Sequence, residues 1–406
     1  MTPTEDQLHP LEGLLVVAVE QAVSAPFCTR QLGDLGARVI KVESRDGGDF
    51  ARNYDGVVRG MSAHFVWANR SKESVALNLK HPHGKEVLAR LIARADVLVQ
   101  NLAPGAAGRI GLDPAKLRAR HPRLITVDIS GYGQDGPYAA ARAYDLLVQA
   151  EAGSCAITGT PEHPAKPGIP LADIGAGVYA LTSVLTALLV RGRTGKGSGI
   201  SVGLFDVVAE WMGFALNQAR YGSGEVLPNG LSSPMVSPYG AYRTKDGQTL
   251  VLGTTNDREW RRLAADVLAR QDLAADARYA TNPERVALRS ELDGIIAAWA
   301  GERTLDECRN AAEAAGLGHA RLNTPAEVLD HPQLTERGRW RSADSPVGPV
   351  QALLPPPEVS GWEWRWDPVP ALGEHTEAVL AELGYRPDEI AALYTEGAAG
   401  PSVRSS

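Results

Sequence analysis

Cysteine is scarce in this 406-residue chain, and the three cysteines, Cys28, Cys155 and Cys308, form no Cys-x-x-Cys pair. An odd count without paired spacing argues against a disulfide framework and a zinc site, so no metal is expected. The N-terminus lacks a cationic start followed by an apolar run, so no signal peptide is expected. No run reaches the about 18 apolar residues of a membrane helix. These absences predict a cytoplasmic protein without a membrane partner.

An excess of positive charge is also lacking. Lys and Arg number 41 against 48 Asp and Glu, which gives a formal net charge of −7. The whole-chain field therefore repels polyanions, and nucleic acid is not an expected partner. A small anionic ligand would need a local cluster of basic groups. The length and the 44% hydrophobic content predict a large core and two domains.

Common catalytic and nucleotide motifs are missing as well. No Gly-x-Ser-x-Gly marks a hydrolase, and no glycine fingerprint follows the first strand, which argues against an NAD-dependent dehydrogenase. The glycine-rich stretch 192–199 follows a helix pattern and precedes a strand-like run, the reverse of a phosphate loop. A helix end and turn is the favoured interpretation. His81 and His83 lack a third ligand nearby, so they indicate an exposed helix start.

Short apolar runs alternate with helical patterns in the first part of the chain. The runs at 14–19, 37–43, 96–100 and 124–129 predict strands, with helices between them that include 82–95. Such alternation predicts β-α-β units and hence a parallel α/β sheet. From about residue 221 the pattern changes, because Asp-Gly separates two strand-like runs within 242–252 and helices then dominate. Residues 221–330 are therefore predicted to form a smaller α+β domain, and 353–370 an extended strap.

Polar and basic residues cluster where the predicted strands end. Val23 and Ser24 follow the first strand, Arg45 follows the second, and Asn101 and Arg109 follow a later one. Ligands bind at the carboxyl edge of open parallel sheets, so these residues are candidates for binding an anion. Two more cations, Arg70 and Lys72, occupy a polar loop just before another strand.

Several further segments are recognisable when read in order. They are Gly-Tyr-Gly-Gln-Asp-Gly-Pro (131–137), Ala-Tyr-Asp-Leu-Leu-Val-Gln (143–149), Leu-Ala-Asp-Ile-Gly-Ala-Gly (171–177) and Leu-Gly-Glu-His-Thr (372–376). Together with the strand-end residues they resemble the class III CoA-transferase family, which includes formyl-CoA transferase, carnitine CoA-transferase and α-methylacyl-CoA racemase. The resemblance covers nearly the whole chain. It implies a large Rossmann-like domain built from both chain ends, 1–220 and 331–406, a small inserted domain at 221–330, and an interlocked homodimer.

The resemblance also implies covalent catalysis by Asp173, which matches the family's nucleophilic aspartate in a glycine-rich turn that opens a helix. Taken alone, Asp173 would be read as a helix cap. Its carboxylate is expected to be stabilised by the helix N-terminus, with Gly175 and Gly177 leaving room for acyl-CoA. Attack on the thioester would give a mixed anhydride and then an aspartyl-CoA thioester, which an incoming acid discharges. Asp145 matches a family carboxylate that orients Asp173 or the ligand.

For CoA, the resemblance carries over a set of binding positions and no permanently bound cofactor. The matching residues are Val23, Ser24, Lys72, Asn101, Leu102, Arg109, Ile110 and Arg142. Ser44 stands where formyl-CoA transferase has an arginine, so Arg45 is expected to substitute for it. The implied partners are an acyl-CoA and a small carboxylic acid. Residues 143–153 and 158–160 favour the branch that handles dicarboxylic acids with succinyl-CoA, and the loop 231–240 lacks the glycine run expected for formate or oxalate.

Two alternatives of other classes stay open at the level of sequence. A racemase of the same fold uses a His–Asp pair where this chain has Tyr144 and Asp145, so proton abstraction would lose one of its acid–base partners. A non-catalytic CoA-binding protein is disfavoured because the candidate nucleophile is present.

Overall fold

The computed structural model describes residues 8–222 and 226–400, which divide into two compact units. The first unit lies within residues 1–153, 167–214 and 338–406, and the second within 154–166 and 215–337. Residues 154–166 carry no boundary signal in the sequence, which predicts them as part of the large domain. They pack with the second unit, where the N–H of Gly230 donates to the carbonyl of Gly159 at 2.6 Å.

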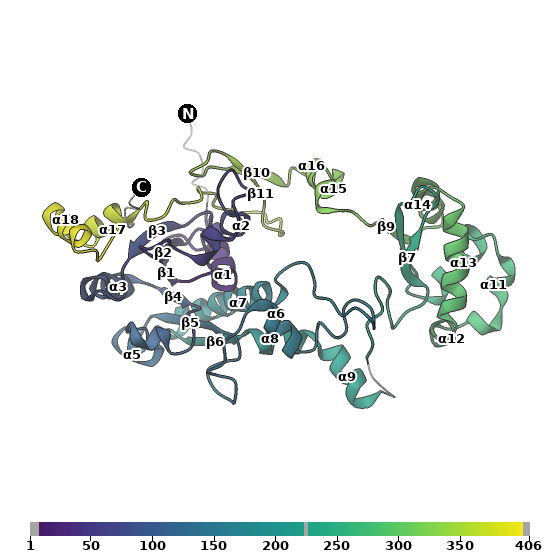
Figure 1. Ribbon diagram of the computed structural model, residues 1–406, viewed down its shortest axis with the longest axis horizontal. Coiled ribbons are helices and arrows are strands. Elements are labelled where there is room, and N and C mark those ends of the chain that lie inside the picture. The colour runs from purple at the N-terminus through teal and green to yellow at the C-terminus, as the bar shows by residue number, and fades with distance from the viewer. Residues whose placement is uncertain (1–7, 223–225, 401–406) are drawn as a thin grey trace. The chain divides into compact units, whose positions relative to one another are not determined.

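A six-stranded sheet forms the centre of the first unit (Figure 1). Its strands are β1 (Leu15–Val19), β2 (Arg38–Ser44), β3 (Glu73–Leu77), β4 (Val97–Gln100), β5 (Ile125–Ser130) and β6 (Gly199–Gly203). The strand order is β3-β2-β1-β4-β5-β6 and every pair is parallel, which confirms the predicted parallel α/β sheet. The strand order changes direction between β1 and β4, because the chain passes from β1 to β2 and β3 on one side and continues with β4, β5 and β6 on the other. Ligands bind at such a switch point in parallel sheets.

Helices of the first unit connect these strands and follow them. They are α1 (Ser24–Asp34), η1 (Phe50–Asn53), α2 (Ala63–Asn69), α3 (Pro82–Arg94), α4 (Ala106–Arg109), α5 (Pro114–Arg120), α6 (Asp145–Glu151), α7 (Leu171–Thr194), α8 (Leu204–Trp211), α17 (Thr376–Glu382) and α18 (Pro387–Thr395). Helix α9 (Gly213–Tyr221) crosses the boundary between the units. A hairpin of β10 (Trp340–Ala343) and β11 (Val350–Leu353) precedes residues 354–371, which contain no helix or strand, in line with the predicted strap.

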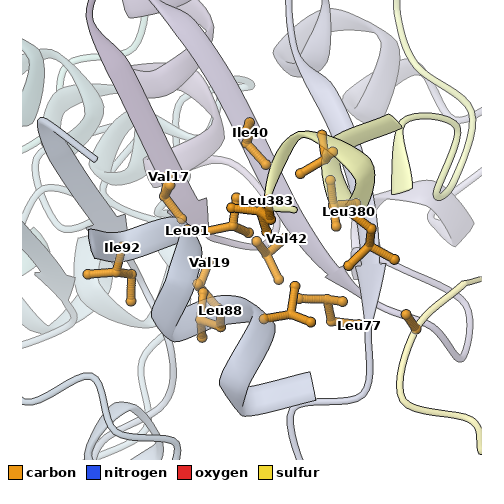
Figure 2. Close-up of a cluster of buried hydrophobic side chains, with 14 of the residues drawn as sticks. Val17, Val19, Ile40, Val42, Leu77, Leu88, Leu91, Ile92, Leu380 and Leu383 are labelled. Carbon is orange, nitrogen blue, oxygen red and sulfur yellow. The ribbon is translucent and has the colours of Figure 1, made fainter. Parts of the chain in front are cut away.

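One hydrophobic core joins the two ends of the chain (Figure 2). Val17 of β1 and Ile40 of β2 are buried with Leu88 of α3, with Leu380 of α17 and with Leu383, which immediately follows α17. The connection continues through backbone bonds. The N–H of Gly400 donates to the carbonyl of Ala76 at 3.0 Å. The C-terminal segment is therefore part of the sheet's own core and not an appendage.

The second unit contains a three-stranded antiparallel sheet of β7 (Tyr239–Arg243), β8 (Thr249–Gly253) and β9 (Gly318–Arg321). The β7–β8 pairing runs from Tyr239–Gly253 to Arg243–Thr249, which is the hairpin expected from the Asp-Gly turn. Helical segments complete the unit: α10 (Asp257–Arg262), η2 (Leu263–Val267), α11 (Gln271–Ala275), η3 (Ala277–Tyr279), α12 (Asn282–Ala287), α13 (Arg289–Gly301), α14 (Leu305–Ala314), α15 (Pro325–Leu329) and α16 (Pro332–Thr335). Trp260 and Tyr279 are buried at its centre.

Candidate active site

The N-terminus of α7 is capped by a side chain from another helix. Pro170 precedes α7 and makes no side-chain cap. Instead, Asp145 at the start of α6 accepts hydrogen bonds from the N–H groups of Ala172 at 2.9 Å and Asp173 at 3.3 Å. Its second oxygen accepts from the amide of Gln149 at 2.7 Å. The Asp145 carboxylate thus occupies donors that a helix N-terminus normally offers to an anion.

Asp173 lies half-buried in the first turn of α7. Burial of the carboxyl group is the main cause that raises the pKa of Asp173 to about 7, and the negative charge of Asp145 adds to it. A hydrogen bond from the hydroxyl of Ser24 acts in the opposite direction. The expected stabilisation of the anion by the helix N-terminus is therefore outweighed. The N–H groups of Ala172 and Asp173 donate to Asp145. The negative charge of Asp145 in turn repels the Asp173 carboxylate.

Ser24 is held in place by the strand-end residue Asn101. The side-chain amide of Asn101 donates to Ser24 Oγ at 3.2 Å and to the carbonyl of Gln21 at 2.8 Å. The Asn101 carbonyl oxygen accepts from the N–H of Gln21 at 2.9 Å. Val23, which immediately precedes α1, is buried. The loops after β1 and β4 therefore meet and hold Ser24, whose hydroxyl lowers the pKa of Asp173.

Two glycines of α7 set how closely its neighbours approach. A Cβ on Gly177 would lie 2.7 Å from the carbonyl oxygen of Ser24, and one on Gly175 would lie 2.6 Å from the ring of Trp211 in α8. These glycines were expected to make room for acyl-CoA. In the structure they make room for α1 and α8 instead, because both face into the packed unit.

Lys72 occupies a different place from the one expected for a phosphate contact. Its ammonium is fully buried and donates to Glu20 at 2.7 Å, to the Pro26 carbonyl at 3.0 Å and to Asn69 at 3.0 Å. Glu20 also pairs with the buried Lys41. The charge of Lys72 is thus neutralised beneath α1, where burial without a partner would be costly. Lys72 therefore supports the loop after β1 and is not retained as a phosphate contact.

Residues 11–376 match the model of CoA-transferase family III. The chain belongs to this family. It is 35% identical over 399 residues to the succinate–glutarate CoA-transferase of Agrobacterium fabrum, covering 94% of this chain and 98% of that protein. It is 31% identical over 400 residues to human succinyl-CoA:glutarate CoA-transferase, covering 97% and 90%.

The fold is shared with a solved structure of the same group. A CAIB/BAIF family protein from Brucella suis superposes with a TM-score of 0.82 at 34% identity, covering 93% of this chain and all of that one. The protein is thus an acyl-CoA-dependent CoA-transferase.

The other predicted CoA contacts of this family III CoA-transferase follow β4 and β5 in the chain. Leu102 follows Asn101, and its N–H donates to the side chain of Gln100 at 2.7 Å. Arg109 ends α4 and is exposed, as is Arg142, while Ile110 is half-buried. Neither Arg109 nor Arg142 forms an ion pair with any residue in the described ranges 8–222 and 226–400, so both guanidinium groups remain accessible to an anion.

Arg45 is half-buried and packs against Gly397, where a Cβ would collide with its guanidinium.

Tyr54 is a residue near the site that the sequence analysis does not predict. Burial raises the pKa of its phenol, and the negative charges of Asp49 and Asp173 add to the shift, so the ring lies near the carboxyl group of Asp173. The only sequence signal for Tyr54 is an aromatic residue in a polar loop, which is too common to be specific.

Gly177→Ala should weaken both the fold and the transferase activity, because the new methyl group would collide with the Ser24 carbonyl, push α7 from α1 and move Ser24 relative to Asp173. Gly192→Ala is the matched control in the same helix, since a Cβ there meets nothing within 4 Å. The control should gain up to about 1 kcal/mol from helix propensity. Thermal melts and steady-state rates check both. Equal behaviour of the two variants would contradict the packing role of Gly177.

Asp173→Asn should make the protein more stable at pH 8. The pKa of Asp173 is raised in the folded state, so stability falls as the pH rises from the ordinary aspartate range through about 7. Asparagine removes this loss. The gain in Tm over the parent should be present at pH 8 and should disappear near pH 4, and exposed Asp135→Asn should show no such difference. A destabilised variant at pH 8 would show that the anion is favoured by its surroundings.

Proposed function

We propose that this CoA-transferase carries its acyl and CoA groups on the carboxylate of Asp173. The observation that supports the proposal is the position of this carboxyl group, half-buried at the start of α7 and beside Asp145, with the Ser24 hydroxyl acting to lower its pKa. A pKa of about 7 leaves a large fraction ionised at neutral pH and makes the carboxylate more basic than an ordinary one, which suits a nucleophile.

The proposed reaction proceeds through two mixed anhydrides. An Asp173 oxygen attacks the donor's thioester carbonyl, and the C–S bond breaks to release CoA thiolate. The thiolate attacks the carbonyl carbon of Asp173, which frees the first acid and leaves an aspartyl-CoA thioester. The acceptor carboxylate attacks this thioester and displaces the thiolate again. The thiolate then attacks the acceptor's acyl carbon, and Asp173 is regenerated as a carboxylate.

The surroundings of Asp173 favour the covalent intermediates. Both the anhydride and the thioester at Asp173 are uncharged, whereas the free carboxylate is repelled by Asp145 and deprived of water. The effects that raise the pKa of Asp173 therefore also favour its acylation. Hydrogen-bond donors for the tetrahedral intermediates are typically worth about 3–4 kcal/mol each, and we propose the Ser24 hydroxyl as one such donor, because it acts to lower the pKa of Asp173.

For the substrates, we propose succinyl-CoA as donor and a dicarboxylic acid as acceptor. Relatives are named for glutarate, D-citramalate and L-malate in combination with succinate or succinyl-CoA. The accessible Arg109 and Arg142 are proposed to meet the CoA phosphates, with Arg45 beside them. We propose that the pantetheine and adenine groups pass along the loops after β1 and β4, at Val23, Asn101, Leu102 and Ile110.

We also propose that two copies of the chain form the family's interlocked dimer. Large apolar side chains are exposed along consecutive helices of the first unit: Leu146, Leu147, Val178, Tyr179, Leu189, Val190, Trp211 and Phe214. Helix α7 is long and apolar enough to span a membrane. Its opposite side, however, packs on α1 and the sheet, and Arg191 pairs with Asp96 at 2.9 Å. A second protein chain is therefore the better cover for the exposed side.

The dimer should appear as a particle of twice the 43.2 kDa chain mass in light scattering coupled to gel filtration. Leu189→Glu, on the exposed side of α7, should shift the population toward the monomer because it buries a charge in the interface. Leu329→Glu, also at an exposed leucine but in α15, serves as control. A parent protein that elutes as a monomer at micromolar concentration would contradict the proposal.

The covalent role of Asp173 is tested by kinetics with succinyl-CoA and a panel of dicarboxylic acceptors. Asp173→Asn should lose at least about 10³-fold in kcat/KM. Asp145→Asn should keep the nucleophile but lower its pKa, because a neighbouring negative charge is removed. The acid limb of its pH–rate profile should therefore move to lower pH, with a reduced plateau rate at pH 8. If the acid limb of the pH–rate profile stays at the same pH in Asp145→Asn, Asp145 does not influence the ionisation of Asp173.

A further inference from the structure

Three side chains able to bind a metal ion meet where α3 begins and α18 ends. His81 precedes α3, His83 lies in its first turn, and Glu396 follows the last residue of α18. One ligand atom from each lies within 4.8 Å of the others, and His83 Nδ1 is 2.8 Å from a carboxylate oxygen of Glu396. From the sequence alone, the two histidines predict no metal site, because no third ligand is near them in the chain. Glu396 is 313 positions from His83, so only the fold brings it in.

We propose that His81, His83 and Glu396 form a binding site for a divalent transition metal, with Zn²⁺ as the best match. Two imidazoles and one carboxylate are common zinc ligands at about 2.0–2.2 Å, with water completing a tetrahedron. In such a tetrahedron the ligand atoms lie about 3.4 Å apart, whereas in the structure His83 Nδ1 and Glu396 are 2.8 Å apart and the three ligand atoms lie within 4.8 Å of one another. The His83 and Glu396 side chains are 51% and 45% exposed, so small rotations can adjust these distances.

The local electrostatics are balanced around this site. The N-terminus of α3 disfavours a cation, whereas the carboxylate of Glu396 and the C-terminal end of α18 favour one. A bound metal would take the place of the hydrogen bond between His83 and Glu396. His81 Nδ1 also accepts a long hydrogen bond of 3.3 Å from the N–H of His83. Coordination through Nε2 of His81 would give up that weak contact.

Metal binding would fasten the C-terminal segment to the sheet. Immediately after Glu396, Gly397 packs against Arg45, and the carbonyl of Ala398 accepts from the N–H of Asn78 at 2.9 Å. Asn78 lies between β3 and α3, three residues before His81. A bound ion would therefore link two segments that already meet in the core, and it would stabilise the folded state in proportion to its occupancy.

The test uses the untagged full-length protein after treatment with a chelator. ZnCl₂ is titrated by calorimetry, and CoCl₂ by visible absorption as a report on coordination geometry. The parent should bind one ion per chain with a rise in Tm. His83→Ala and Glu396→Gln should each weaken binding at least about tenfold and lose the rise in Tm. Because both side chains are exposed, the metal-free variants should melt like the parent.

Two controls separate this site from other zinc ligands in the chain. His163→Ala removes an exposed histidine of the second unit, and Cys155→Ser removes a partly exposed thiol. Both variants should bind like the parent. The proposal is overturned if the parent shows no saturable binding, or if His83→Ala binds as tightly as the parent. In either case the cluster is only the His83–Glu396 ion pair.

Discussion

The repulsion between two carboxylates at the start of α7 is the interaction on which the site depends. Asp145 takes the N–H groups of Ala172 and Asp173, so the helix N-terminus is already neutralised by a charge from α6. Asp173 must then hold its own charge partly buried, and the Ser24 hydroxyl only partly offsets the rise of its pKa. Every element that fixes these two side chains therefore sets how strongly the Asp173 anion is disfavoured.

This arrangement costs stability and favours chemistry for the same reason. Acylation removes the negative charge of the carboxylate. Surroundings that destabilise this charge therefore favour the acylated intermediate, and they lower the stability of the free enzyme. Rigid contacts around Ser24 and the loop after β1 keep the site in this arrangement. The hydrogen bonds of Asn101 fix the loop that holds Ser24, and the buried Glu20–Lys72 pair lies beneath that loop. Membership of CoA-transferase family III fits such a site, because this family transfers CoA between carboxylic acids.

Sequence patterns predicted the parallel sheet and the small domain's hairpin, because alternating apolar runs and an Asp-Gly turn are local signals. The resemblance assigned Asp173 as the nucleophile and Asn101 as a CoA contact, and in the structure Asn101 holds Ser24, whose hydroxyl acts on the pKa of Asp173. Predictions that depend on distant partners were wrong or missed. Lys72 pairs with Glu20 instead of facing a ligand, and Glu396 joins His83 from the far end of the chain. No local pattern reports such contacts, since each is created by tertiary packing.

The most direct test of the central claim is a mass measurement of the covalent intermediate. The enzyme is incubated with succinyl-CoA, quenched with hydroxylamine, digested, and its peptides are analysed by mass spectrometry. An aspartyl hydroxamate should appear at Asp173 in the parent enzyme and be absent from Asp173→Asn. If an acyl-CoA that the enzyme turns over leaves no modification at Asp173, or leaves it at another residue, Asp173 is not the carrier.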